Sequence, residues 1–294
     1  MRLDESAVFH ALPAALAQRF TVTFVFFLGW CGVFLALYSR PTSERLMRKV
    51  SEDARGKGPR MERQELATRM TGLLHAALIA AGSASLLFFR GDSPLYVRRL
   101  WDWKSWPDFE AFDERAVFYA CAASGYFVAD LIITVVLLEE NGPEFLVHAV
   151  AGLGGSAWCV VHGRGLVYLM VLMLFEVSTP FLHVRWLLLE YGYKDSLVFI
   201  LNGLALVFAF TACRIVIGFP VIAKLIFELH TSLVGQESIV TRVFFTLAGL
   251  AMCALNAKWG VALWMGFLRA LGLVKRREKP HASRTVQAMT GKEE

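Results

Sequence analysis

The stretch FTVTFVFFLGWCGVFLALY, residues 20–38, contains no Asp, Glu, Lys, Arg or His. As an α-helix this stretch rises about 28 Å, close to the roughly 30 Å thickness of the hydrocarbon core of a bilayer. An uncharged run of this length is typical of a transmembrane helix. The residues before it have mixed polarity and lack the basic segment and short apolar core of a signal peptide. We therefore interpret residues 20–38 as an uncleaved first membrane helix.

Apolar stretches of similar length recur along the rest of the chain. They cover residues 70–89, 116–138, 145–161, 165–189, 196–219 and 243–268. The composition agrees, because 56% of the 294 residues are hydrophobic and 19% are charged, against about 45–50% and about 25% in soluble domains. The sequence therefore predicts an all-α, multi-pass integral membrane bundle of seven transmembrane helices. A shorter apolar segment, residues 221–229, follows Pro220 and is interpreted as interfacial or re-entrant.

Basic residues are concentrated in two segments. Residues 39–69 contain nine Lys and Arg, and the tail from Arg269 contains seven. With seven spans both segments lie on the same face, which the positive-inside rule makes cytosolic, and the N-terminus is then lumenal or external. We expect an endomembrane location such as the endoplasmic reticulum, with the plasma membrane as the alternative. The chain divides into residues 1–62 (first helix and basic cytosolic loop), 63–268 (six helices) and 269–294 (a basic, disordered cytosolic tail).

Several classes of function have no support in the sequence. The net charge of +5 is explained by basic segments beside the membrane, so no nucleic-acid partner is expected. The five cysteines lie singly inside apolar stretches, and no CxxC, HExxH or HxH spacing, GxSxG elbow or Walker loop occurs. We therefore expect neither a metal nor another cofactor.

Polar residues interrupt the apolar stretch 165–189. Glu176, Pro180 and His183 lie at i, i+4 and i+7 on one helical face, with Ser178 beside the proline. A charge at the bilayer centre costs at least about 2.5 kcal/mol on insertion scales, so Glu176 should face the bundle interior and find a partner. Pro180 removes a helix hydrogen bond and leaves the carbonyl of Glu176 free. This surface either contacts a ligand or is a packing feature in which Glu176 pairs with an arginine.

Other ionisable residues inside the predicted spans extend this candidate site. Asp130 shares a helical face with Tyr126, and its candidate partners are His148 and Arg214. Lys258, in the last span, either extends to the interface or pairs with Glu176. We expect the interior groups to converge on one cavity, because each would cost several kcal/mol if isolated in lipid. The candidate cavity or lipid-binding residues are Tyr126, Asp130, His148, Glu176, Ser178, Pro180, Arg214 and Asn256.

Seven short motifs follow one another in a recognisable order. They are SGYFVAD at 124–130, FLVH at 145–148, EVSTPFL at 176–182 with Arg185 and Trp186, Asn202-Gly203, Arg214, Leu255-Asn256 with Trp259, and the early His75. In this order and spacing the set resembles the TLC (TRAM, Lag, CLN) domain family of multi-pass membrane proteins. The resemblance runs from about residue 63 to about residue 268, and it implies that this part of the chain is a TLC domain.

Two branches of that family differ at positions present in this chain. The Glu-x-Ser-Thr-Pro-Phe form at 176–181 resembles the TLC-domain-containing branch, whose members are linked to membrane lipid composition. The ceramide synthases, in contrast, carry a His-His pair and a later His-Asp-x-x-Asp run. Here His148 matches the first histidine of the pair, Ala149 stands at the second, and the Glu176 motif retains one carboxylate of the later run.

The resemblance implies two alternative functions. In the first, the protein binds or handles membrane lipid and influences lipid composition, with Asp130 or Glu176 meeting a headgroup amine and Arg214 a phosphate. In the second, it is a ceramide-synthase-like N-acyltransferase that uses acyl-CoA and a long-chain amine. His148 would then be the catalytic base or nucleophile, and Asp130 would fix its tautomer. A transporter or cargo receptor is a third reading, against which the missing inverted repeat argues.

Overall fold

The computed structural model describes residues 5–39, 59–97, 102, 104, 106–231, 237–270 and 272–274. Within these ranges every regular element is a helix, and seven helices are long and apolar enough to cross a membrane. This confirms the predicted all-α, multi-pass bundle. The basic connection at 40–58 and the end of the tail from residue 275, for which the sequence predicts a cytosolic loop and disorder, lie outside the described residues.

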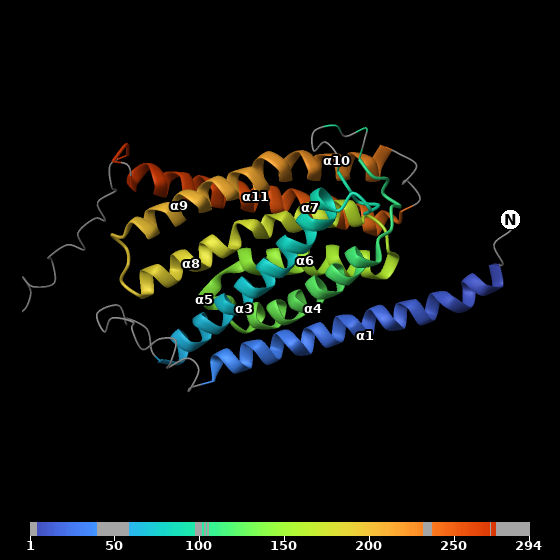
Figure 1. Ribbon diagram of the computed structural model, residues 1–294, viewed down its shortest axis with the longest axis horizontal. Coiled ribbons are helices and arrows are strands. Elements are labelled where there is room, and N and C mark those ends of the chain that lie inside the picture. The colour runs from blue at the N-terminus through green and yellow to red at the C-terminus, as the bar shows by residue number, and fades with distance from the viewer. Residues whose placement is uncertain are drawn as a thin grey trace, which may run out of the picture.

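The helices run back and forth along the long axis of the bundle (Figure 1). In chain order they are α1 (Glu5–Tyr38), α3 (Pro59–Ala84) with the π-helical turn η2 (Ser85–Phe89), α4 (Glu114–Val136), the short α5 (Leu138–Asn141), α6 (Pro143–His162), α7 (Leu166–Met173) with the 3₁₀ turn η4 (Leu174–Val177), α8 (Thr179–Glu190), α9 (Leu197–Phe210) with the π-helical turn η5 (Thr211–Ile217), α10 (Gly218–Thr231) and α11 (Ile239–Ala270). Helix α1 lies along one edge, and α9, α10 and α11 lie along the opposite edge (Figure 1).

Helix α4 forms the packed centre, between α1 and α6. Residues 120–125 of α4 are all small and all buried. Small residues let neighbouring backbones approach closely in a membrane bundle. At Gly125 a Cβ atom would lie 2.7 Å from the backbone nitrogen of Phe27 in α1, and at Gly152 of α6 it would lie 2.5 Å from the ring of Phe127. Both contacts therefore depend on a glycine.

The segment at 221–229 corrects one prediction. It lies in α10, which continues from α9 through η5, and Val221, Ile222, Leu225 and Leu229 are buried in the bundle. The segment is therefore the buried end of a long helix that continues from α9, and not a separate re-entrant segment. The physical reason is that a π-helical turn directly precedes Pro220, and such local adjustments let a membrane helix accommodate a proline.

The described residues of the segment before α4 contain a cap on that helix. Asp113 caps α4 by accepting a hydrogen bond from the Arg115 amide, and its carboxylate also accepts bonds from the Arg115 guanidinium at 2.9 Å and the Ser93 hydroxyl at 2.8 Å. Burial alone would raise the pKa of the Asp113 carboxyl, but these hydrogen bonds outweigh it and hold that pKa below its usual value. In the same loop, the Phe109 carbonyl accepts a 2.7 Å bond from the Gly165 amide.

Candidate functional site

Two irregular turns face each other near the centre of the bundle. Glu176 lies in the 3₁₀ turn η4, just before Pro180, and Arg214 lies in the π-helical turn η5. Both side chains are buried, since Glu176 is 8% and Arg214 is 6% exposed. The guanidinium Nη2 of Arg214 lies 4.0 Å from Oε1 of Glu176. The carboxylate predicted to need a partner inside the membrane therefore has an arginine.

Arg214 also donates hydrogen bonds to uncharged acceptors in the motif around Glu176. Its Nε donates to the Phe175 carbonyl and to the Ser178 hydroxyl, both at 3.1 Å, and Nη2 donates to the Thr179 hydroxyl at 3.2 Å. Nη1 lies 3.4 Å from Oδ1 of Asn256 in α11. The carbonyl that Arg214 binds is that of Phe175, one residue before the carbonyl that the proline was expected to free. Arg214 thus links three spanning helices through their polar residues.

A cavity of about 110 Å³ opens beside this pair. His148 and Glu176 lie in its wall, and the rest of the lining is almost entirely apolar. The apolar lining comes from α6, α7, α10 and α11, and includes Gly155, Leu172, Leu225, Phe245 and Ala248. The cavity therefore has a polar end and an apolar remainder, as sites for amphipathic ligands do.

Several buried polar atoms in the interior of the bundle have no hydrogen-bond partner among the described residues. They include Nδ1 of His148, Nδ2 of Asn256, Nδ1 of His183 and both ring nitrogens of His75. Buried polar groups in native proteins are bonded in more than about 90% of cases, to protein or to ordered water. Of these residues, His148 lies in the cavity wall, where a polar ligand or water can complete its hydrogen bonding.

His75 is a member of this group that the candidate residue set leaves out. Its ring stacks on Tyr126 with 3.7 Å between centroids and 7° between planes, and Trp30 packs edge-on against both rings. Gly72 leaves space for His183 and Tyr126, because a Cβ atom at this position would lie 2.9 Å from Nε2 of His183 and 3.3 Å from the Tyr126 hydroxyl. The match of His75 to the early histidine of the family was the one signal that could have identified it.

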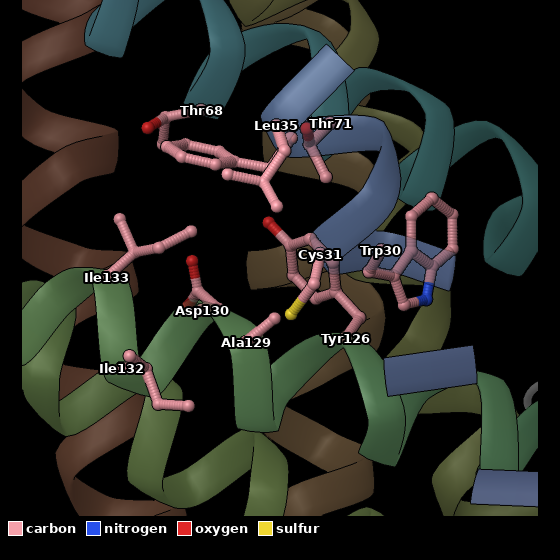
Figure 2. A pocket seen from close by; sticks show the side chains of 11 residues that line it. Trp30, Cys31, Leu35, Thr68, Thr71, Tyr126, Ala129, Asp130, Ile132 and Ile133 are labelled. Carbon is pink, nitrogen blue, oxygen red and sulfur yellow. The ribbon is translucent and has the colours of Figure 1, made fainter. Parts of the chain in front are cut away.

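Asp130 does not join this cavity. It lines a second pocket between α1, α3 and α4, together with Tyr126 (Figure 2). His148 and Glu176 therefore share the first cavity, Arg214 lies next to Glu176, and Asp130 lies elsewhere. No hydrogen bond joins Asp130 to His148 in the described structure, and Nδ1 of His148 is without a partner there. The role expected of Asp130 in fixing the tautomer of His148 thus has no contact to support it. The physical reason is the rotation of α4, whose Asp130 face points to α3 and α1.

Two further expectations concern charge and metal. Lys258 forms an ion pair with Glu144 at the start of α6, and its side chain is largely exposed. It therefore extends toward the end of the bundle and does not pair with Glu176. Among the residues that the structure describes, no group of three His, Cys, Asp or Glu side chains could hold a metal ion.

Comparison with known proteins identifies relatives over the same region. The TLC domain model of the TRAM, LAG1 and CLN8 family matches residues 65–265. The chain is 32% identical over 146 residues to an uncharacterized TLC domain-containing protein of Schizosaccharomyces pombe, a match that covers 48% of each chain. It is 24% identical over 151 residues to TLC domain-containing protein 4-B of Xenopus laevis, covering 50% of this chain and 57% of the relative. It is 36% identical over 69 residues to TLC domain-containing protein 1 of Gallus gallus, covering 23% and 27%.

The chain spans about half the length of the first two of these relatives. The family match, in contrast, extends from α3 to α11, and so includes the Glu176–Arg214 pair and the cavity beside it. With these residues, seven spanning helices and a family model that matches more than half of the sequence, the chain belongs to the TLC domain family.

Proposed function

We propose that this protein binds a membrane lipid inside the bundle and thereby influences membrane lipid composition. The polar end of the lipid lies at His148, Glu176, Arg214 and Asn256, and its hydrocarbon chain lies in the apolar part of the cavity. The observation that carries this proposal is the unpartnered Nδ1 of His148, which lies with Glu176 in the wall of an otherwise apolar cavity. A lipid headgroup supplies the missing hydrogen-bond partner, and the hydrocarbon chain of the lipid fills the apolar part of the cavity.

The apolar part is long enough for an acyl chain. A second hollow, lined by Phe109, Trp158 and Tyr168, shares Gly155 and Leu172 with the first cavity. Together they follow α6 from His148 to Trp158, which is about 15 Å of helix. This length corresponds to one leaflet of a bilayer, about half of the 30 Å hydrocarbon core. The track therefore fits one chain of a membrane lipid better than a small polar solute.

Filling the track tests the proposal. A Cβ atom at Gly155 would lie 4.0 Å from the ring of Phe245, so Gly155→Leu occupies the cavity without a backbone clash. The matched control is Gly32→Leu, because nothing lies within 4 Å of that position in α1. Native mass spectrometry and lipidomics of the purified proteins should find a retained lipid in the wild type and in Gly32→Leu, and much less in Gly155→Leu. Equal lipid content in all three would contradict the proposal.

The acyltransferase alternative is favoured by one observation, the position of His148 in the cavity wall. In that reaction acyl-CoA would transfer its acyl group to a long-chain amine, with His148 as base or nucleophile. Our expectation is that purified wild type shows no such transfer and that His148→Ala changes only lipid retention or stability. Transfer by the wild type above a membrane-protein control, lost in a folded His148→Ala variant, would establish the alternative instead.

The setting of this activity is also part of the proposal. We place the protein in the endoplasmic reticulum or another endomembrane, with a lumenal N-terminus and a cytosolic C-terminus, because the basic segments at 39–69 and after Arg269 then face the cytosol. Residues 63–268 form the lipid-binding unit, and residues 1–62 and 269–294 flank it. The match of the family model to residues 65–265 supports this division.

A further inference from the structure

We propose that the pocket between α1, α3 and α4 is a second ligand site, which binds the positively charged nitrogen of a membrane-dissolved amphiphile. This pocket has a volume of about 230 Å³ and is separate from the cavity lined by His148 and Glu176. Adjacent residues of α4 show the separation, because Tyr126 lines this pocket and Phe127 lines the other. The inference goes beyond the lipid site proposed above, and occupation of one pocket does not require occupation of the other.

The charge balance of the interior indicates what this pocket lacks. Several carboxylates of the spanning helices have a cation as partner: Arg214 pairs with Glu176, and Arg69, Lys258 and Lys224 pair with Glu65, Glu144 and Glu228. Asp130 forms no ion pair or hydrogen bond with any described residue, and the charge that acts on it is the like charge of Glu176. A carboxylate in lipid without a cation is expensive and marks a functional site by default. A ligand that carries a cation removes this imbalance.

The walls of the pocket suit a cation on an apolar body. Figure 2 shows the Asp130 carboxylate and the Tyr126 hydroxyl directed into the same space. Trp30, Phe34 and Tyr126 supply aromatic rings, whose faces attract ammonium groups. The hydroxyls of Thr68 and Thr71 also line the pocket and have no hydrogen-bond partner among the described residues, although Thr71 is only 4% exposed. They can accept the remaining N–H bonds of a primary ammonium.

The rim of the pocket is apolar and exposed, which suits a ligand that enters from the bilayer. Leu35 of α1 and Ile132 of α4 line this rim, and they are 62% and 51% exposed. The rest of the lining is apolar except for the residues named above. A ligand that enters here has to be dissolved in the bilayer, so an amine with a single hydrocarbon chain fits and a free polar amine does not.

Photolabelling tests the proposal directly. The probe is a diazirine-bearing long-chain primary amine, used on the purified full-length protein in detergent micelles, and the comparison probe is the same chain with a terminal alcohol. We expect the amine to label peptides of α1, α3 and α4 around Trp30, Thr68 and Ile133. Asp130→Asn, which keeps the shape of the side chain, should reduce this labelling at least about tenfold, because it removes the only charge that holds the ammonium. The matched control Asp195→Asn removes a carboxylate from an exposed loop and should have no effect.

The outcomes separate this site from the lipid site proposed above. Asp130→Asn should retain the same lipid in native mass spectrometry as the wild type, which also shows that the variant is folded. Equal labelling by amine and alcohol, or labelling unchanged in a folded Asp130→Asn variant, would overturn the proposal and identify the pocket as an unspecific lipid crevice. Labelling confined to peptides around His148 and Glu176 would overturn it as well, because the amine would then bind in the first cavity.

Discussion

The guanidinium of Arg214 lies 4.0 Å from the carboxylate of Glu176, and each residue belongs to a turn that is not α-helical. The irregular turn before Pro180 lets the carbonyl of Phe175 accept a hydrogen bond from Arg214, at 3.1 Å. The arginine is therefore held by both a charge and the backbone. This double attachment fixes the polar end of the cavity at one depth in the bundle.

Removing Arg214 should destabilise the protein more than removing the charge of Glu176. Arg214→Leu leaves the Glu176 carboxylate buried without a cation and leaves acceptors on Ser178 and Asn256 unbonded, so we expect a loss of about 3–5 kcal/mol in stability. Glu176→Gln should lower stability clearly less, because the arginine retains its hydrogen bonds to the Phe175 carbonyl and to the Ser178 and Thr179 hydroxyls. Thermal unfolding of the purified proteins in detergent measures both. A Glu176→Gln variant as unstable as Arg214→Leu would show that the ion pair dominates.

The crossing of α1 and α4 should depend on Gly125. A leucine there would place its Cβ 2.7 Å from backbone atoms of both Phe27 and Thr23, so α1 has to move away. We predict that Gly125→Leu lowers the thermal unfolding temperature and makes α1 accessible to protease. Gly29→Leu is the matched control, because nothing lies within 4 Å of Gly29, and it should change stability by no more than about 0.5 kcal/mol.

The loop cap at Asp113 should give a pH-dependent contribution to stability. Its pKa is lower in the folded protein than in the unfolded chain, so the carboxylate stabilises the fold above the unfolded pKa of about 3.9 and loses this effect as the pH falls through the folded pKa. Asp113→Asn retains a capping side chain but loses the ion pair with Arg115. We predict that the variant is less stable than the wild type by a constant amount from pH 5 to pH 8 (on the order of 1 kcal/mol), and that the difference shrinks below about pH 4.

Unfolding curves measured across this pH range test the prediction. Asp108→Asn provides the control, since Asp108 is exposed in the same loop. A wild-type advantage that grows as the pH falls would have the wrong sign and would exclude the hydrogen bonds from Arg115 and Ser93 as its source.

The orientation of the chain should follow its basic segments. We predict that a tag at the C-terminus is removed when sealed microsomes are treated with protease, and that a tag at the N-terminus is protected. The reason is that seven spans put residues 39–69 and the tail on the same face, which the positive-inside rule predicts to be cytosolic. A C-terminal tag that survives the protease would reverse the orientation proposed here.

The spans could be predicted from sequence because each is a run of apolar residues long enough to cross the bilayer, a local property. The pairing of Glu176 with an arginine could also be anticipated, since a buried carboxylate needs a cation. The direction of Asp130 could not. Helix α4 is apolar on every side, so its periodicity does not indicate which face meets which neighbour. Asp130 and Tyr126 do share a face, but it faces α1 and α3 and not His148.

The other differences have similar causes. The sequence predicts a separate segment at 221–229 because a proline such as Pro220 usually interrupts a helix. No local sequence pattern indicates the π-helical turn that precedes it. The partner of Lys258 depended on where the start of α6 lies relative to α11, which only the packed structure fixes. In each case a contact between distant segments decided the outcome.

The π-helical turn at 211–217 carries a consequence for how this fold tolerates changes in length. Successive residues of an α-helix are rotated by about 100°, and a π-helical turn accommodates extra residues without lengthening the helix in proportion. Deleting one residue after Arg214 would return the turn toward α-helix and rotate α10 against α9, moving Ile222 and Leu225 away from the cavity that they line. The fold therefore constrains the spacing between Arg214 and these two residues independently of their identity. A relative with a regular helix here should align with a single-residue gap between the two.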